Sequence, residues 1–116
     1  QIRRLDLRAS AVALAPGATV GFDFESWGRT EAHAQLELIQ GGVSETLAMR
    51  FLPRNTNALH DPRPQRGAAS VVLTPAMLAR FTSDSAMLRT TAFGSMQWFR
   101  TPPPTIREQR VRVTLE

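Results

Sequence analysis

Cysteine, lysine and tyrosine are absent from this sequence of 116 residues. Without cysteine the chain has no disulfide framework and no thiol nucleophile, but a chain of this length can bury one core without such staples. All 14 basic residues are arginine, against 10 acidic residues, so the formal charge is +4. We interpret arginine without lysine as the mark of a GC-rich genome. Selection for bidentate contacts to carboxylates or phosphates is the alternative.

Long apolar runs are also missing. No run approaches the roughly 20 residues that a membrane-spanning helix needs, so we expect a chain that does not span a membrane. The length suits a single domain covering residues 1–116. The sequence begins at Gln1 rather than Met, as a chain does after signal-peptidase cleavage. A domain boundary inside a longer chain would explain this first residue equally well. We expect an exported protein, located in the periplasm, at the cell surface or outside the cell.

Short segments in which every second residue is apolar recur along the chain. The firmest alternates Val20, Phe22 and Phe24 with small or acidic residues, which is typical of a half-buried antiparallel strand. Seven strands are expected, at residues 2–7, 19–25, 32–39, 45–51, 69–73, 85–93 and 110–115. So many short strands in one small domain predict an all-β, two-sheet antiparallel sandwich, with a closed barrel as the alternative.

Two segments depart from this alternation. Thr74 can cap the start of a helix and Pro75 suits its first position, so we expect one short helical turn between the fifth and sixth strands. Leu78 and Phe81 lie three residues apart and would plug one end of the core. Residues 53–67 contain many turn formers without periodicity and are predicted to be a long loop.

The alternation also assigns side chains to the core. In the fourth strand it places Leu47, Met49 and Phe51 inside. In the last strand it places Val111, Val113 and Leu115 inside. The first and last strands are expected to be sheet edges, to which a strand of a partner could be added.

The segment from Leu14 to Phe24, followed by Trp27-Gly28, resembles a pattern common in bacterial extracellular immunoglobulin-like domains. In these domains a Pro-Gly turn leads into an alternating second strand. The helical turn at residues 74–81 resembles their crossover between strands E and F. The resemblance implies a seven-stranded immunoglobulin-like sandwich and no ligand site. The sequence departs from antibody-type domains because it lacks their cysteine pair, central tryptophan and corner tyrosine.

Residues that could carry catalysis or bind a metal are sparse. The two histidines, His33 and His60, have no third ligand at a helpful spacing, so we expect surface or loop roles and no metal site. Gly94-Ser95 lacks the second glycine of a Gly-x-Ser-x-Gly nucleophile motif, and no glycine-rich phosphate loop is present. We therefore expect no catalytic residue, no cofactor and no enzymatic activity.

Six arginine and aromatic residues are candidate contacts with a partner: Arg54, Arg63 and Arg66 in the predicted loop, and Trp98, Phe99 and Arg100 before a triple proline. Such residues dominate the hot spots of protein interfaces. We therefore expect a non-catalytic structural or interaction module of a bacterial cell-envelope or extracellular assembly, with a protein partner or neighbouring subunit. A carbohydrate- or peptide-binding accessory module, with Trp27 or Trp98 as a stacking platform, is the alternative. Nucleic-acid binding is the third alternative, but no continuous basic stripe is visible, so a nucleic-acid partner is not expected.

Overall fold

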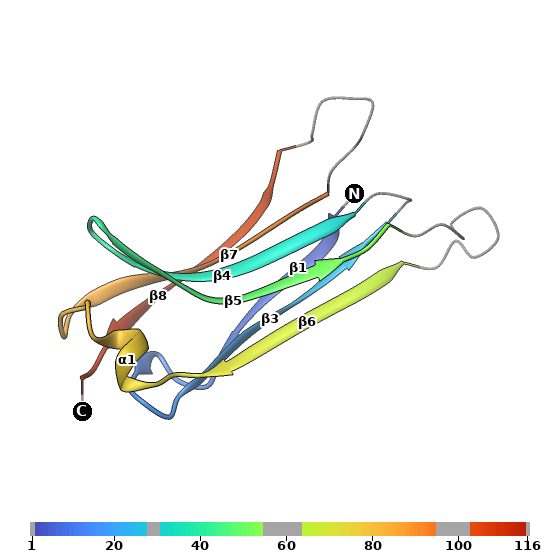
Figure 1. Cartoon of the computed structure of the whole chain (residues 1–116). Helices are drawn as coiled ribbons and strands as arrows, with labels where there is room; N and C mark the ends of the chain where they lie inside the picture. Colours follow the sequence, from blue (N-terminus) through green and yellow to red (C-terminus); the bar gives the residue numbers. More distant parts are fainter. Residues whose placement is uncertain (1, 28–30, 55–63, 95–102, 116) are drawn as a thin grey trace.

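The computed structural model describes residues 2–27, 31–54, 64–94 and 103–115. In these ranges the chain is all-β apart from one short helix, and its strands form two sheets that face each other across one core (Figure 1). The elements are β1 (Ile2–Ala9), β2 (Ala13–Leu14), β3 (Thr19–Ser26), β4 (Ala32–Gln40), β5 (Val43–Leu52), β6 (Gln65–Val72), α1 (Pro75–Leu78), β7 (Ser85–Gly94) and β8 (Thr105–Val113). Each of the seven predicted strands overlaps one of these strands, and β2 is additional.

The strands divide into a three-stranded sheet with the order β1-β3-β6 and a five-stranded sheet with the order β2-β8-β7-β4-β5. Neighbours are antiparallel except for β2, which pairs with β8 in parallel. The five-stranded sheet curls, so that β5 lies near β6 of the other sheet (Figure 1). In the described ranges no ladder joins the two sheets, which therefore remain separate. The helix found there, α1, is too short to cross a membrane.

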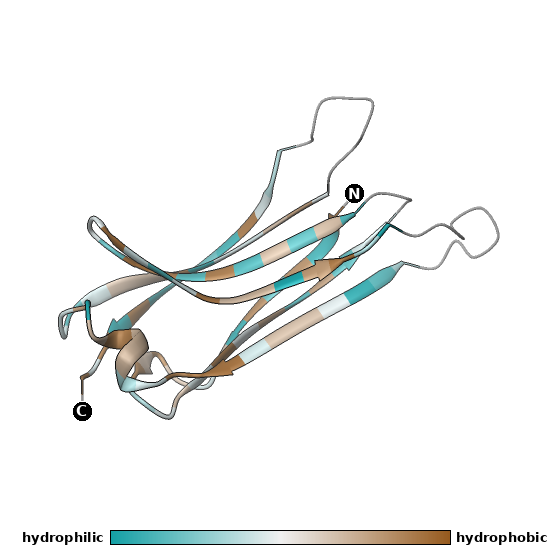
Figure 2. Ribbon diagram, in the orientation of Figure 1, coloured by the Kyte–Doolittle hydropathy of each residue, from teal (hydrophilic) through white to brown (hydrophobic). Residues whose placement is uncertain are grey.

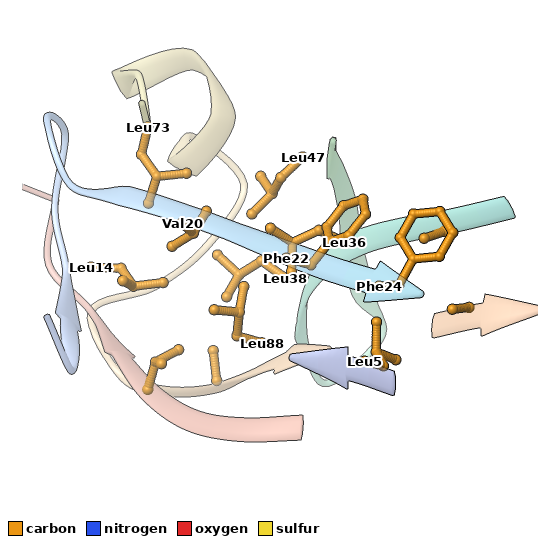
Figure 3. Packing of buried hydrophobic residues seen from close by; sticks show 14 of the residues in the cluster. Leu5, Leu14, Val20, Phe22, Phe24, Leu36, Leu38, Leu47, Leu73 and Leu88 are labelled. Carbon is orange, nitrogen blue, oxygen red and sulfur yellow. The ribbon is translucent and has the colours of Figure 1, made fainter. Parts of the chain in front are cut away.

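The core lies between the sheets and is built from alternate residues of facing strands. Phe22 and Phe24 of β3 pack toward Leu36 and Leu38 of β4, and all four are buried (Figure 3). Figure 2 shows the alternation of hydrophilic and hydrophobic residues along β4. One face of each strand is thus buried and the other is left outside, as the sequence pattern predicts.

The helix α1 covers one end of this core, between the ends of β6 and β7 (Figure 1). The hydroxyl of Thr74 accepts a hydrogen bond from the backbone amide of Met77 at 3.3 Å, and Pro75 is the first helical residue. Leu78 and Phe81 are buried. The predicted cap, helical turn and end plug are confirmed.

A β-bulge in β5 shows that the predicted core positions of Met49 and Phe51 are wrong. The register between β4 and β5 shifts so that Leu47 is an extra residue in β5. Because side chains alternate with a period of two, one extra residue sends every later side chain to the opposite face. Leu47 and Leu52 are buried, whereas Met49 is 71% and Phe51 48% exposed.

The predicted loop at residues 53–67 is also partly wrong, because Gln65, Arg66 and Gly67 belong to β6. These three residues continue the ladder with β3, where Gln65 lies opposite Ser26. Two polar residues and a glycine carry no apolar alternation, so the pattern could not indicate a strand there. Residues 55–63 of the predicted loop lie outside the described residues.

The C-terminal strand differs from the prediction at both of its ends. It begins at Thr105 rather than near Arg110 and ends at Val113, so Leu115 lies beyond the ladder and is 48% exposed instead of buried. The edge of β8 at residues 112–113 is occupied by β2 of the same chain, so this end is not free for a partner. The other predicted edge, β1, is an edge of the three-stranded sheet.

Candidate binding face

Side chains on the outer face of the five-stranded sheet line up in rows across β5, β4, β7 and β8, because each row consists of residues that are partners in the ladders between these strands. The first row consists of Phe51, His33 and Phe93, with His33 in the middle. The ring centroid of His33 lies 4.9 Å from that of Phe51. It lies 5.1 Å from that of Phe93, and these two rings are stacked at 15°. The Nε2 atom of His33 is 3.8 Å from a carboxylate oxygen of Glu31.

The second row consists of Met49, Gln35, Thr91 and Ile106. Met49 and Ile106, at its two ends, are exposed large hydrophobic residues, as is Phe51 in the row above. We call Phe51, His33, Phe93, Met49 and Ile106 the apolar patch. Single exposed hydrophobic residues are ordinary on a protein surface, whereas a group of them on one face is a candidate interaction site.

A shallow pocket of about 250 Å³ lies over the β5 side of the apolar patch. It is lined by His33, Ala34, Gln35, Met49, Arg50, Phe51 and Phe93. Pockets for drug-sized ligands usually measure about 300–1,000 Å³ and enclose most of the ligand. This smaller and open hollow has the size to receive one side chain of a partner.

A charged row borders the apolar patch on the same face. Glu37, Arg89 and Glu108 lie side by side on β4, β7 and β8. Arg89 is 2.8 Å from the carboxylate of Glu108, and Glu37 accepts a hydrogen bond from the amide of Gln35 at 3.1 Å. Polar side chains that form an ion pair and a hydrogen bond with one another therefore lie next to the apolar patch.

The outer face of the three-stranded sheet is charged rather than apolar. Three arginine–carboxylate pairs cover it, namely Arg4–Asp6 at 2.6 Å, Arg8–Asp23 at 3.2 Å and Arg66–Glu25 at 2.9 Å. Asp6 lies directly opposite Asp23 in the ladder between β1 and β3, so the arginines offset two adjacent like charges. The hydrogen bond to Asp6 and the charge of that carboxylate raise the pKa of Arg4 above its ordinary value. The positive and negative charges of these three pairs cancel one another on this face.

Two of the six predicted contact residues lie in the described part of the chain. Arg54 follows the end of β5 and is exposed. Arg66 lies in β6, paired with Glu25 on the charged face, and therefore on a different surface from the apolar patch. The other four lie outside the described residues, and their contacts stay predictions: Arg63, Trp98, Phe99 and Arg100.

The remaining expectations concern histidine and tryptophan. His33 lies on the outer face of its strand, as predicted, while His60 is outside the described residues. Across the described ranges, no group of three or more metal-ligating side chains is found. Trp27 is 38% exposed, and the guanidinium carbon of Arg3 lies 5.0 Å from its ring centroid. A cation thus covers one face of the Trp27 ring, which counts against this ring as an open stacking platform.

The sequence analysis missed the apolar patch because it assigned Met49 and Phe51 to the core. One signal could have indicated the bulge. Leu47 and Leu52 are five positions apart in the sequence. Two residues an odd number of positions apart lie on opposite faces of a regular strand. Two leucines at this spacing can both be buried only if the strand contains an irregularity such as a bulge, and here Leu47 is the extra residue.

Comparisons with known proteins leave the family open. No protein-family profile matches the chain, and no curated protein matches it. Among solved structures, a protein from Archaeoglobus fulgidus is similar over the full length of both chains, with 7% identity and a TM-score of 0.45. A β-glucosidase from Listeria innocua in complex with isofagomine is similar over 95% of this chain and 16% of its own length, with 12% identity and a TM-score of 0.47.

Proposed function

We propose that this chain is a non-catalytic interaction module that contacts a protein partner through the outer face of its five-stranded sheet. The apolar patch is the observation that carries this proposal. Met49, Phe51 and Ile106 are exposed and lie in two adjacent rows, around the ring stack of His33 and Phe93. Removing this surface from water on binding supplies the main favourable free energy of protein association.

Three properties of the surface favour a protein over a small ligand. Its pocket is open and about 250 Å³ in volume, which suits one inserted side chain. Aromatic and methionine side chains are enriched in the cores of protein interfaces. The neighbouring row of Glu37, Arg89 and Glu108 supplies charges that can fix the orientation of a partner.

The proposal includes the immunoglobulin-like assignment and its setting. The assignment is supported by the strand order β1-β3-β6 in one sheet and β2-β8-β7-β4-β5 in the other, with α1 at the crossover from β6 to β7. A bacterial cell-envelope or extracellular assembly is the setting that the resemblance of residues 14–28 implies.

A matched pair of surface variants tests the function. Met49→Glu places a charge in the apolar patch, and Val72→Glu places the same charge on β6, a strand of the three-stranded sheet, at another exposed apolar residue. The unmodified chain is used to capture a protein from a bacterial envelope extract, and the captured protein is identified and purified. It is then titrated by isothermal calorimetry against the unmodified chain and each of the two variants. We expect Met49→Glu to weaken binding about tenfold or more and Val72→Glu to leave it unchanged.

The same variants distinguish the carbohydrate alternative. Polysaccharides of the bacterial envelope are titrated into the unmodified chain and into the Met49→Glu variant while tryptophan fluorescence is followed. Saturable binding of a polysaccharide that survives Met49→Glu would contradict the proposal, as would a protein partner whose affinity is equal for all three proteins.

A further inference from the structure

We propose that the protein partner at the apolar patch is a second copy of this chain, packed face to face about a two-fold axis. The axis runs parallel to the strands, between β4 and β7. This inference rests on the proposed function, because it names the occupant of the same surface. A face that binds itself about a two-fold axis must be self-complementary, with each group meeting a suitable group of the second copy.

The register of the strands determines which residues of the two copies face each other in each row. A two-fold axis between β4 and β7 places β4 over β7 of the second copy, and β5 over β8. Residues of these strands that share a row lie at the same height along the axis. Each row of one copy therefore faces the same row of the other copy, in reversed order.

The second row of the apolar patch and the centre of the first row match themselves under this operation, while Phe51, at the end of the first row, faces the segment before Thr105, where β8 begins. His33 faces Phe93 of the second copy, which extends the ring stack already present within one chain. Met49 faces Ile106 of the second copy, so the two exposed ends of the second row cover each other. Between them Gln35 faces Thr91, a pair that can form a hydrogen bond.

The charged row matches itself as well. Glu37 of each copy faces Arg89 of the other, which gives two ion pairs across the interface. Arg89 is already oriented by Glu108 at 2.8 Å. The position of the axis is decisive here. An axis along β4 would place Glu37 on Glu37, and an axis along β7 would place Arg89 on Arg89, both of which oppose like charges.

The size of the surface sets the expected affinity. Four strands about 4.8 Å apart and three rows about 6.7 Å apart cover a footprint of about 400 Å². Standard interfaces bury about 800 Å² on each partner, so this contact lies at the small end. Aligned sheets also cross at about −30°, so the match is closest in the central rows. We therefore expect a dimer that forms at high protein concentration and dissociates on dilution.

Sedimentation velocity over a wide range of protein concentrations tests the inference. The unmodified chain is expected to shift from monomer to dimer as concentration rises. Glu37→Arg and Arg89→Glu, made separately, should each raise the dimer dissociation constant about tenfold or more, because each places like charges in contact. The double variant restores both ion pairs across the interface and should recover part of the lost affinity, because Arg89→Glu also removes the pair with Glu108 within each chain. Circular dichroism and thermal unfolding establish that each variant is folded.

Distances between the two copies test the geometry independently. The sequence contains no cysteine, so Ser70→Cys provides one spin-labelling site per chain on the three-stranded sheet. Every measured distance then comes from two different chains. In the proposed dimer the two labelled strands are separated by three sheet-to-sheet spacings, or about 30 Å at the backbone. A dimer formed through the edges of β6 would give a much shorter distance.

The possible results separate this inference from the proposed function. A chain that stays monomeric at all concentrations, but loses another protein partner in the Met49→Glu variant, overturns the inference and leaves the function standing. A dimer that is insensitive to Met49→Glu and to both charge reversals overturns the inference and contradicts the function. A dimer lost in each single reversal and recovered at least in part in the double variant supports both.

Discussion

Gly67 lies directly against the ring of Phe24, its partner in the ladder between β3 and β6. A Cβ atom at position 67 would be 2.5 Å from Cε1 and 2.7 Å from Cζ of that ring. Phe24 is buried, and its ring has no flexible end that could move aside. The aromatic core of the three-stranded sheet therefore depends on the absence of a side chain on the neighbouring strand.

Gly67→Ala should lower the free energy of unfolding by about 1–3 kcal/mol, because the added methyl group overpacks the core. Urea denaturation followed by circular dichroism measures the loss. Gly42→Ala is the matched control, since a Cβ at that turn meets nothing within 4 Å. In a Phe24→Leu background the effect of Gly67→Ala should shrink, because the clashing ring is absent. An undiminished effect there would show that the ring is not its cause.

Thr90→Val should lower the free energy of unfolding by about 1 kcal/mol. The hydroxyl of Thr90 is fully buried and donates a hydrogen bond to the carbonyl oxygen of Gln35 at 2.9 Å. Valine keeps the shape but removes the donor. Thr46→Val makes the same change at an exposed position of β5 and should stay within about 0.5 kcal/mol. Equal effects of the two substitutions in urea denaturation would argue against a role for the hydrogen bond.

The segment from α1 to Arg80 should be held to the core by the packing of Leu78 rather than by the ion pair of Arg80. Leu78 is buried, so Leu78→Ala is expected to lower the free energy of unfolding by about 2–5 kcal/mol. Arg80 donates to the carbonyl oxygen of Ser44 at 2.7 Å and pairs with Glu45, but its side chain is 60% exposed. Arg80→Ala should therefore remove less than about 1 kcal/mol. Thermal and urea unfolding of both variants give the comparison, and a larger loss for Arg80→Ala would reverse this ranking.

The bulge in β5 predicts opposite outcomes for two residues that alternation alone treats alike. Leu47→Ala should lower the free energy of unfolding by about 2–4 kcal/mol, because Leu47 is buried. Met49→Ala should change it by less than about 0.5 kcal/mol, because Met49 is exposed. A substantial loss of stability in Met49→Ala would mean that β5 has no bulge and that Met49 faces the core.

The alternation of apolar and polar residues correctly predicted those strands in which every second side chain is buried. Leu36 and Leu38 of β4, and Leu88 of β7, face the core as the period of two requires. The cap by Thr74 was equally predictable, because a side chain that binds an amide three residues later is a local interaction. These features depend only on neighbours along the chain.

The candidate face could not be predicted in the same way. His33, Phe51 and Phe93 come from three separate segments, and only the register of β4 with β5 and β7 brings their rings together. The bulge that turns Phe51 outward is a property of the pairing between two strands. Arg66 was expected in a loop because its strand carries no alternation at that end, where the ladder with β3 sets the conformation.

The sequence by itself determined the all-β class, most of the strands, the helical plug and the absence of any disulfide. Each of these follows from the identity and spacing of residues close together in the chain. Only the tertiary structure decided the partition into sheets of three and five strands and the exposure of Met49 and Phe51. It also decided the contact between Gly67 and Phe24. Strand pairing joins residues far apart in sequence, so a shift of one residue in register reverses which face a side chain occupies.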